Sequence, residues 1–316
     1  MTEQPTLAVQ WFFGRVTSVA AELFLRVRWP GAEDGPTLPL LPKIHQVSVA
    51  GPRSRYARTL EHRLGMTPVV GDTGLWHATL AEPCFWTPQQ PYVYVASLHV
   101  ELQNGVTSEI SLQLGVPVLV ARQRRLEQEG RNFVLRGAAL HRVDTLSLAK
   151  CHDSSTALVL SQPSDEVCAE ATSIGVGVVA DLGQLPATEV AAELRRVALW
   201  PAVRIAILPS AARLEPALRQ ETAHVVRAQR WTPADAAGIS EWAQVLVSER
   251  GDVLDGMTPR EELPVLVWAQ RCGEAGQSDN PDAADSRTQV ELYRQACDSL
   301  QAEVAGQREF AGYLVG

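Results

Sequence analysis

The chain has 316 residues, enough for about two domains, and it is 46% hydrophobic and 20% charged, which is typical of a globular protein in water. The net charge of −8 argues against nucleic acid or an anionic membrane as the main partner. No apolar run approaches the roughly 20 residues that cross a bilayer. The N-terminus lacks a basic segment, and Arg15 interrupts the apolar stretch at Trp11–Phe13, so we expect no signal peptide.

The five cysteines are odd in number and widely spaced. None forms a C-x-x-C pair, the spacing that would indicate a zinc site or a redox motif. We therefore expect free thiols, a cytoplasmic location, no metal and no cofactor.

Residues 1–125 are predicted to form a β-sandwich of immunoglobulin-like architecture, because short alternating strands follow one another without a long helix. Asn104-Gly105 lies between two of these strands and is a hairpin signal. The expected strands are Val16–Trp29, Ile44–Val49, Leu75–Leu80, Tyr92–Leu102 and Ile110–Val120.

Residues 126–316 change to strands that alternate with helices, which implies parallel pairing. Ser164 and Thr188 are expected to cap helices at 165–173 and 189–199, and Ser286 to open a long helix to about Ala305. Eight strands predict a closed (β/α)8 TIM barrel, shortened because about 185 residues are fewer than the ~250 typical of that fold. The expected strands are Phe133–Ala139, Thr156–Ser161, Val176–Asp181, Val203–Leu208, His224–Gln229, Gln244–Ser248, Pro264–Trp268 and Phe310–Val315.

The strand Val203–Leu208 is an apolar run with one interruption, bounded by Pro201 and Pro209. In a parallel barrel, the residues that follow a strand face the active-site mouth. Here they are Pro209, Ser210 and Ala211, which offer little chemistry.

Two segments carry a family resemblance. Pro83–Tyr94, which contains Trp86-Thr87-Pro88 and ends in Pro-Tyr-Val-Tyr, is similar to the W-(S/T)-P-…-P-x-L-Y segment of the immunoglobulin-like domain in glycoside hydrolase family 2. Asn132–His141 resembles the family's F-x-L-N-G-…-L-R-G-V-N-x-H segment that leads into the barrel. Weaker likenesses follow in the same order as far as Phe310-Ala311-Gly312-Tyr313, so the resemblance covers nearly all of the chain from about Leu75 onward.

The departures from this pattern concern the catalytic residues. Family members are retaining glycosidases, which use two carboxylates about 5 Å apart. The acid/base glutamate follows the fourth barrel strand, where this chain matches with Ala211. The nucleophile follows the seventh strand, where it matches with Ala269. The resemblance therefore implies a degenerate member that lacks both catalytic glutamates.

Other residues could line the mouth. Asp181 ends the third strand and Glu249 follows the sixth, and they could form a relocated catalytic pair or be ordinary polar residues of the rim. Trp231, Trp242 and Trp268 could stack on a sugar ring, although the helical spacing around Trp242 favours a core position. Cys272 beside Arg271 could be a reactive thiol, but it lacks a histidine at a recognisable spacing. The candidate ligand-binding residues are His141, Ser161, Gln162, Asp181, Ser210, Trp231, Trp268 and Arg271.

The leading hypothesis is a non-catalytic, glycoside-hydrolase-like protein that acts as a carbohydrate-binding or assembly module. The alternatives are an active glycosidase that uses Asp181 and Glu249, and a structural oligomer subunit. The expected partners are a carbohydrate, another protein or a second copy of the chain, and neither nucleic acid nor a membrane.

Overall fold

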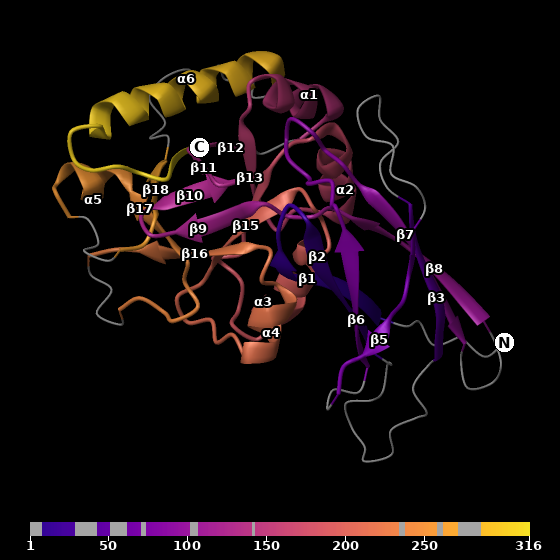
Figure 1. Ribbon diagram of the computed structural model, residues 1–316. Helices are drawn as coiled ribbons and strands as arrows, with labels where there is room; N and C mark the ends of the chain where they lie inside the picture. The colour runs from indigo at the N-terminus through magenta and orange to yellow at the C-terminus, as the bar shows by residue number, and fades with distance from the viewer. Residues whose placement is uncertain are drawn as a thin grey trace. The chain divides into compact units, whose positions relative to one another are not determined.

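The computed structural model of this protein describes residues 8–28, 43–50, 62–70, 74–101, 107–140, 143–233, 238–257, 262–270 and 286–316. The chain divides into two compact units (Figure 1). Unit 1 holds residues 1–86, 92–117 and 220–223, and unit 2 holds residues 87–91, 118–219 and 224–316. The domain boundary expected after residue 125 stays a prediction.

Unit 1 is the immunoglobulin-like β-sandwich that the sequence predicts. One sheet has the order β1-β2-β6-β5 and the other β4-β3-β7-β8, and all pairings are antiparallel. The strands are β1 (Ala8–Val16), β2 (Ala20–Arg28), β3 (Lys43–Ala50), β4 (His62–Leu64), β5 (Thr67–Pro68), β6 (Leu75–Ala81), β7 (Tyr94–Glu101) and β8 (Thr107–Leu114). Leu23, Leu25 and Leu98 are fully buried in its core, as alternation in half-buried strands requires.

The segment Pro83–Tyr94 is held together by a hydrogen bond between its two ends. The backbone N–H of Cys84 donates to the hydroxyl of Tyr94 at 2.6 Å. Burial is the main cause that raises the pKa of Tyr94, so its hydroxyl stays protonated. Trp86 is buried as well. The aromatic residues of this motif therefore have a structural role in unit 1.

Two expected strands of this unit differ in extent from the structure. The expected strand Val16–Trp29 begins at Ala20, and β1 precedes it as a separate strand that the sequence analysis missed. The expected strand Ile110–Val120 is divided between β8 and β9 (Leu119–Arg122). Asn104-Gly105 and Trp29 lie outside the described residues, but β7 and β8 on either side of Asn104-Gly105 pair antiparallel, as in a hairpin.

Unit 2 contains a closed barrel of eight parallel strands in sequential order, β12 to β19, which confirms the predicted architecture. Each expected barrel strand overlaps an observed one. These are β12 (Leu135–Ala139), β13 (Ala157–Ser161), β14 (Val178–Asp181), β15 (Val203–Leu208), β16 (Val226–Trp231), β17 (Val245–Glu249), β18 (Val265–Ala269) and β19 (Gly312–Val315).

The helices that follow the barrel strands have ten residues or fewer except for α6, which explains how the barrel fits into so few residues. The side chain of Ser164 caps α2 as predicted, and Gly175 ends that helix with φ 91°, a conformation that favours glycine. Thr188 does not cap α3, whose N-cap residue is Glu189 without a side-chain hydrogen bond. No helix lies in the described residues between β16 and β17. The helices are α1 (Thr145–Asp153), α2 (Asp165–Ile174), α3 (Val190–Ala198), α4 (Pro216–Glu221), α5 (Arg250–Leu254) and α6 (Ser286–Val304).

A small antiparallel sheet closes the amino end of the barrel. It consists of β9, β10 (Arg125–Gln128) and β11 (Arg131–Phe133). Leu119 and the fully buried Leu126 belong to the same apolar cluster as Leu135 and Val226, which begin barrel strands. These side chains therefore plug the end of the barrel that lies opposite its mouth.

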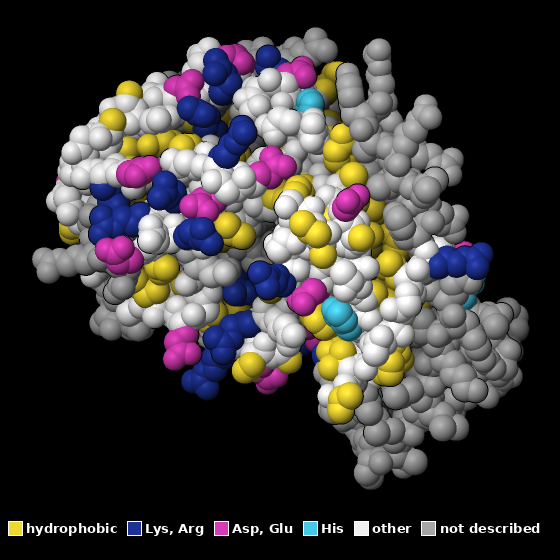
Figure 2. Space-filling view, viewed as in Figure 1, with side chains coloured by type: hydrophobic (Ala, Val, Ile, Leu, Met, Phe, Trp, Pro, Cys, Tyr) yellow, Lys and Arg dark blue, Asp and Glu magenta, His cyan; other side chains and the backbone are white. Residues whose placement is uncertain are grey.

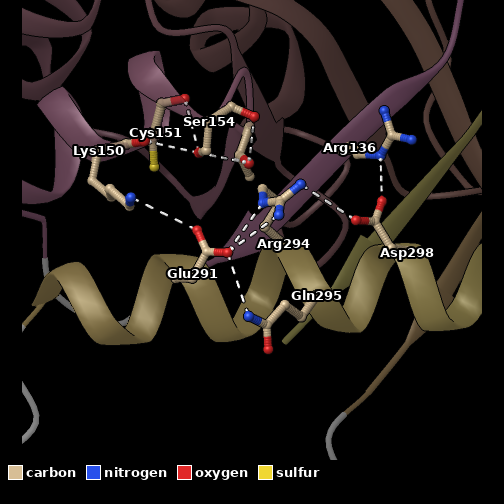
Figure 3. A network of polar contacts seen from close by, with 9 residues as sticks. Arg136, Lys150, Cys151, Ser154, Glu291, Arg294, Gln295 and Asp298 are labelled. Carbon is tan, nitrogen blue, oxygen red and sulfur yellow. Dashed lines mark hydrogen bonds and ion pairs between the residues drawn. The ribbon is translucent and has the colours of Figure 1, made fainter.

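The long helix α6 lies along α1 and β12 and joins the last part of the barrel to the first (Figure 1). Polar contacts follow this junction (Figure 3). Glu291 lies 3.7 Å from Lys150 of α1 and 3.2 Å from Arg294. Asp298 accepts a hydrogen bond of 3.0 Å from Arg136 of β12. Because these side chains are partly exposed to solvent, the network contributes little to stability beyond the apolar contacts beneath it.

Candidate functional site at the barrel mouth

Strand alternation defines which side chains line the carboxyl end of the barrel. Val159, Val179, Ala228 and Val247 all belong to the interior cluster. Side chains two positions further along a strand point to the same face. The interior positions at the mouth are therefore Ser161, Asp181, Arg230 and Glu249.

Arg230 lies at the centre of this site and contacts three neighbouring side chains. Its Nη2 donates to Asp181 Oδ2 at 2.7 Å, and its Nη1 lies 3.7 Å from Glu249 Oε1. Its Cζ lies 4.5 Å from the centre of the Trp268 ring, within range of a cation–π interaction. Arg230 thus joins β14, β16, β17 and β18.

The two carboxylates of the site differ in environment. The Asp181 side chain is 9% exposed, and its Oδ1 accepts a second hydrogen bond, 3.0 Å long, from the Gly183 N–H. The Glu249 side chain is 39% exposed. Burial raises the pKa of Glu249, and the nearby Arg230 guanidinium partly opposes that shift. Asp181 is thus held rigidly with both oxygens engaged, whereas Glu249 keeps one flank open to solvent.

Two buried donors at the mouth have no acceptor within the described ranges, namely Arg230 Nε and Trp268 Nε1. Trp268 itself is 6% exposed and Arg230 lies over its ring. Trp268 therefore positions Arg230 and does not offer an open aromatic face.

The other two tryptophan candidates differ in exposure. Trp231 at the end of β16 is partly exposed. Trp242 is buried and donates to the Ala212 carbonyl, as its expected core position requires, although it lies in a turn and not in a helix.

The alanines that match the two catalytic positions lie at or just after the carboxyl ends of barrel strands. Ala211 lies in the turn after β15, next to Ser210, and Ala269 is the last residue of β18. A methyl group at either place can neither donate a proton nor form a glycosyl ester.

The remaining candidates are only partly brought together. Ser161 ends β13 and is exposed, and the N–H of the adjacent Gln162 donates to the backbone carbonyl of Asp181 at 3.4 Å. His141, Arg271 and Cys272 lie outside the described residues.

Arg230 is the residue of this candidate site that the sequence did not indicate. The signal was a basic residue near the end of an otherwise apolar barrel strand, two positions after the interior residue Ala228. A partly buried cation at that position is stabilised by an anion from a neighbouring strand, and Asp181 supplies it at 2.7 Å.

Three general properties of the described residues bear on what the molecule can bind: the surface charge, the groups that could hold a metal ion and the length of apolar helices. Acidic and basic side chains are interspersed over the viewed face of the barrel unit (Figure 2). Within the described ranges, no group of three or more His, Cys, Asp or Glu side chains is placed to hold a metal ion. In the same ranges, no helix is both long and apolar enough to span a bilayer.

No protein-family model matches the chain, and no curated protein matches it. Solved structures of glycoside hydrolase family 2 share its fold. A β-D-glucuronidase from Dictyoglomus thermophilum is 11% identical and aligns with 97% of this chain and 61% of that chain, at a TM-score of 0.58. A family 2 member from Bacteroides cellulosilyticus is 12% identical over 97% of this chain and 43% of that chain (TM-score 0.62). A β-glucuronidase from Ruminococcus gnavus is 11% identical over 98% and 62% (TM-score 0.59). The chain therefore spans roughly half the length of these structures, and at such identities the likeness concerns the fold.

Proposed function

We propose that this protein is a non-catalytic, glycoside-hydrolase-like protein whose barrel mouth binds carbohydrate. The observation that carries the proposal is Arg230, which occupies the mouth and engages Asp181 at 2.7 Å. The alanines at positions 211 and 269, where the family pattern has glutamates, support it independently.

Retaining hydrolysis needs one protonated carboxyl group and one free carboxylate, about 5 Å apart and on either side of the glycosidic bond. Asp181 has both oxygens engaged by Arg230 and Gly183. Its lone pairs are therefore directed at donors of the protein and not at an anomeric carbon. Glu249 alone cannot supply both roles.

The same arrangement suits the binding of a neutral sugar. Arg230 presents donors that its pairing with Asp181 holds in place, and Glu249 presents an acceptor on its open flank, which together suit specificity for hydroxyl groups. A hydroxyl oxygen of the ligand would also provide an acceptor for Arg230 Nε or Trp268 Nε1, once the site opens to admit it. With Glu249 ionised, the charges of Asp181, Arg230 and Glu249 sum to −1, which disfavours a uronate. We therefore expect neutral saccharides in preference to the β-glucuronides that two of the structural neighbours' names imply.

Titration calorimetry with galactose, lactose, cellobiose and glucuronate tests this proposal. Neutral saccharides should bind saturably, and Arg230→Met should weaken binding at least about tenfold, because a charge-assisted hydrogen bond is lost. Arg131→Met is the matched control, since it removes the same charge from an exposed position of β11 at the other end of the barrel. Equal affinities in wild type and Arg230→Met, or no saturable binding of any saccharide, would contradict the proposal.

One observation favours an active glycosidase as the second candidate. The raised pKa of Glu249 is the property that a general acid needs. This candidate predicts turnover of an aryl glycoside that Glu249→Gln abolishes. A purely structural role predicts neither binding nor turnover, together with a stable oligomer in light scattering.

A cytoplasmic location is part of the proposal. It is supported by the four cysteines in the described ranges, Cys84, Cys151, Cys168 and Cys297, all of which are free thiols.

A further inference from the structure

A second candidate site lies at the opposite, amino end of the barrel, around the first residues of β12 to β15. A cavity of about 30 Å³ is present there, enough for one or two water molecules or a small ion. Its lining includes two arginines and one histidine but no carboxylate: Phe133, Arg136, His152, Thr156, Gly177 and Arg204 are among the residues that form it.

Arg204 is the unusual member of this set. Arg204 is the one polar residue in the otherwise apolar strand β15, and only 7% of its surface is exposed. The register between β14 and β15 shifts at Arg204, which has no partner in β14, and its side chain reaches Gln128 and Phe133 of the small sheet at the amino end of the barrel. A buried cation without an anion is costly, and neighbouring side chains normally supply a carboxylate.

The contacts of Arg204 with the described residues are all to uncharged groups. Its Nη2 donates to Gln128 Oε1 at 2.6 Å, and its Cζ lies 4.8 Å from the centre of the Phe133 ring. No carboxylate of the described residues pairs with it. Burial lowers the pKa of Arg204 to about 10, which leaves it positively charged at neutral pH.

The other basic residues of the cavity have partners of their own. Arg136 donates to Asp298 at 3.0 Å and to Gln301 at 3.1 Å, and Figure 3 shows its guanidinium directed at Asp298. His152 Nδ1 donates to the Gly175 carbonyl at 3.1 Å. The uncompensated positive charge in the cavity therefore belongs to Arg204.

Gly175-Val176-Gly177 explains why there is room beside this charge. The segment leads into β14 and is no helix-opening phosphate loop, but both of its glycines line the cavity. A Cβ at Gly177 would lie 3.2 Å from Arg204 Cδ and 3.9 Å from Arg204 Nη1. The missing side chain keeps the space next to the guanidinium free.

We propose that this cavity binds a small anion, either a halide or an oxyanion group such as a carboxylate or a phosphate, and that Arg204 is the principal residue that binds it. The volume restricts the ligand to an ion or group of that size. Cys151 also lines the cavity, but burial raises the pKa of its thiol to about 12, so it stays protonated and does not compete as an anion. The site is independent of the barrel mouth and of its proposed function.

The test is thermal unfolding of the full chain against increasing sodium chloride, sodium acetate or sodium phosphate. A ligand that binds the folded state raises the unfolding midpoint along a logarithmic curve once its concentration exceeds the dissociation constant, by about 3 °C at ten times that constant. We expect this curve for at least one of the three anions, and which of them produces it distinguishes a halide from a carboxylate or a phosphate.

Two variants assign the effect to the cavity. Arg204→Met should leave only the gradual, linear response to salt, whereas the control Arg131→Met should keep the logarithmic curve of the wild type. Gly177→Ala retains the charge but fills the cavity, and it should weaken the apparent affinity at least about tenfold even if Arg204→Met does not fold. An unchanged affinity in Gly177→Ala, or a logarithmic curve in Arg204→Met, would overturn the proposal, as would the absence of that curve for all three anions in the wild type.

Discussion

Replacement of Arg230 by methionine is the most informative perturbation of the barrel mouth. Methionine keeps much of the apolar contact of the Arg230 stem with Trp268, but it removes the cation that lies 2.7 Å from Asp181. Loss of one partner of a fully buried ion pair costs about 3–5 kcal/mol. Because Arg230 is 32% exposed and Asp181 is 9% exposed, we expect about 2 kcal/mol for the pair. The lost cation–π contact adds about 0.5 kcal/mol.

The cost has a defined physical source. In Arg230→Met, the Asp181 carboxylate remains buried and has only the Gly183 N–H as a donor. The variant therefore leaves an anion without its cation at the barrel mouth.

Urea denaturation of four proteins measures this interaction: wild type, Arg230→Met, Asp181→Asn and the double variant. The double variant should be more stable than the sum of the single effects predicts, by about 1–2 kcal/mol, because the second substitution removes the stranded charge. Additivity within about 0.5 kcal/mol would refute the view that Arg230 and Asp181 form one unit.

Three further predictions follow from other parts of the molecule. Leu126→Ala should destabilise unit 2 by about 3 kcal/mol in urea denaturation, because Leu126 is fully buried beneath the small sheet β9–β11 that closes the amino end of the barrel. A loss below about 1 kcal/mol would mean that this end of the barrel is not tightly packed. Glu249→Gln should be at least as stable as the wild type at pH 7. Burial raises the folded-state pKa of Glu249, so the stability that its protonated carboxyl group contributes is present at low pH and is lost as the pH rises. A clear loss of stability in the variant at pH 7 would contradict this sign. Iodoacetamide at about pH 8 should leave Cys151, Cys168 and Cys297 of the native protein unmodified, as measured by mass spectrometry. Burial raises the pKa values of these thiols to about 12, about 12 and about 11, so they stay protonated and unreactive. Rapid labelling of the native protein would show that this part of the barrel opens.

The sequence predicted the barrel well because its strands have strong, local signals. Val203–Leu208 is bounded by prolines and matches β15 in full, and Ser164 with Gly175 marked both ends of α2. In unit 1 the signals were weaker. The strand Ala8–Val16 carries a continuous apolar stretch without the alternation that distinguishes a strand, so it was missed.

The site was less predictable, because its chemistry depends on contacts between strands. Asp181 and Glu249 were recognisable as residues that end strands, but only the register of the barrel shows that Arg230 reaches both. Arg204 was visible in the sequence only as an interruption of an apolar run. Its burial beside two glycines and Phe133 depends on segments that are far apart in the chain.

The most direct test of the central claim is hydrolysis of a panel of aryl α- and β-glycosides by the wild type, Asp181→Asn and Glu249→Gln. Because Asp181 is engaged by Arg230, and alanine stands at positions 211 and 269, we predict no release of the aryl group above the buffer rate by any of the three proteins. Turnover by the wild type that either substitution abolishes would show that the carboxylates of the mouth are catalytic, and would contradict the account.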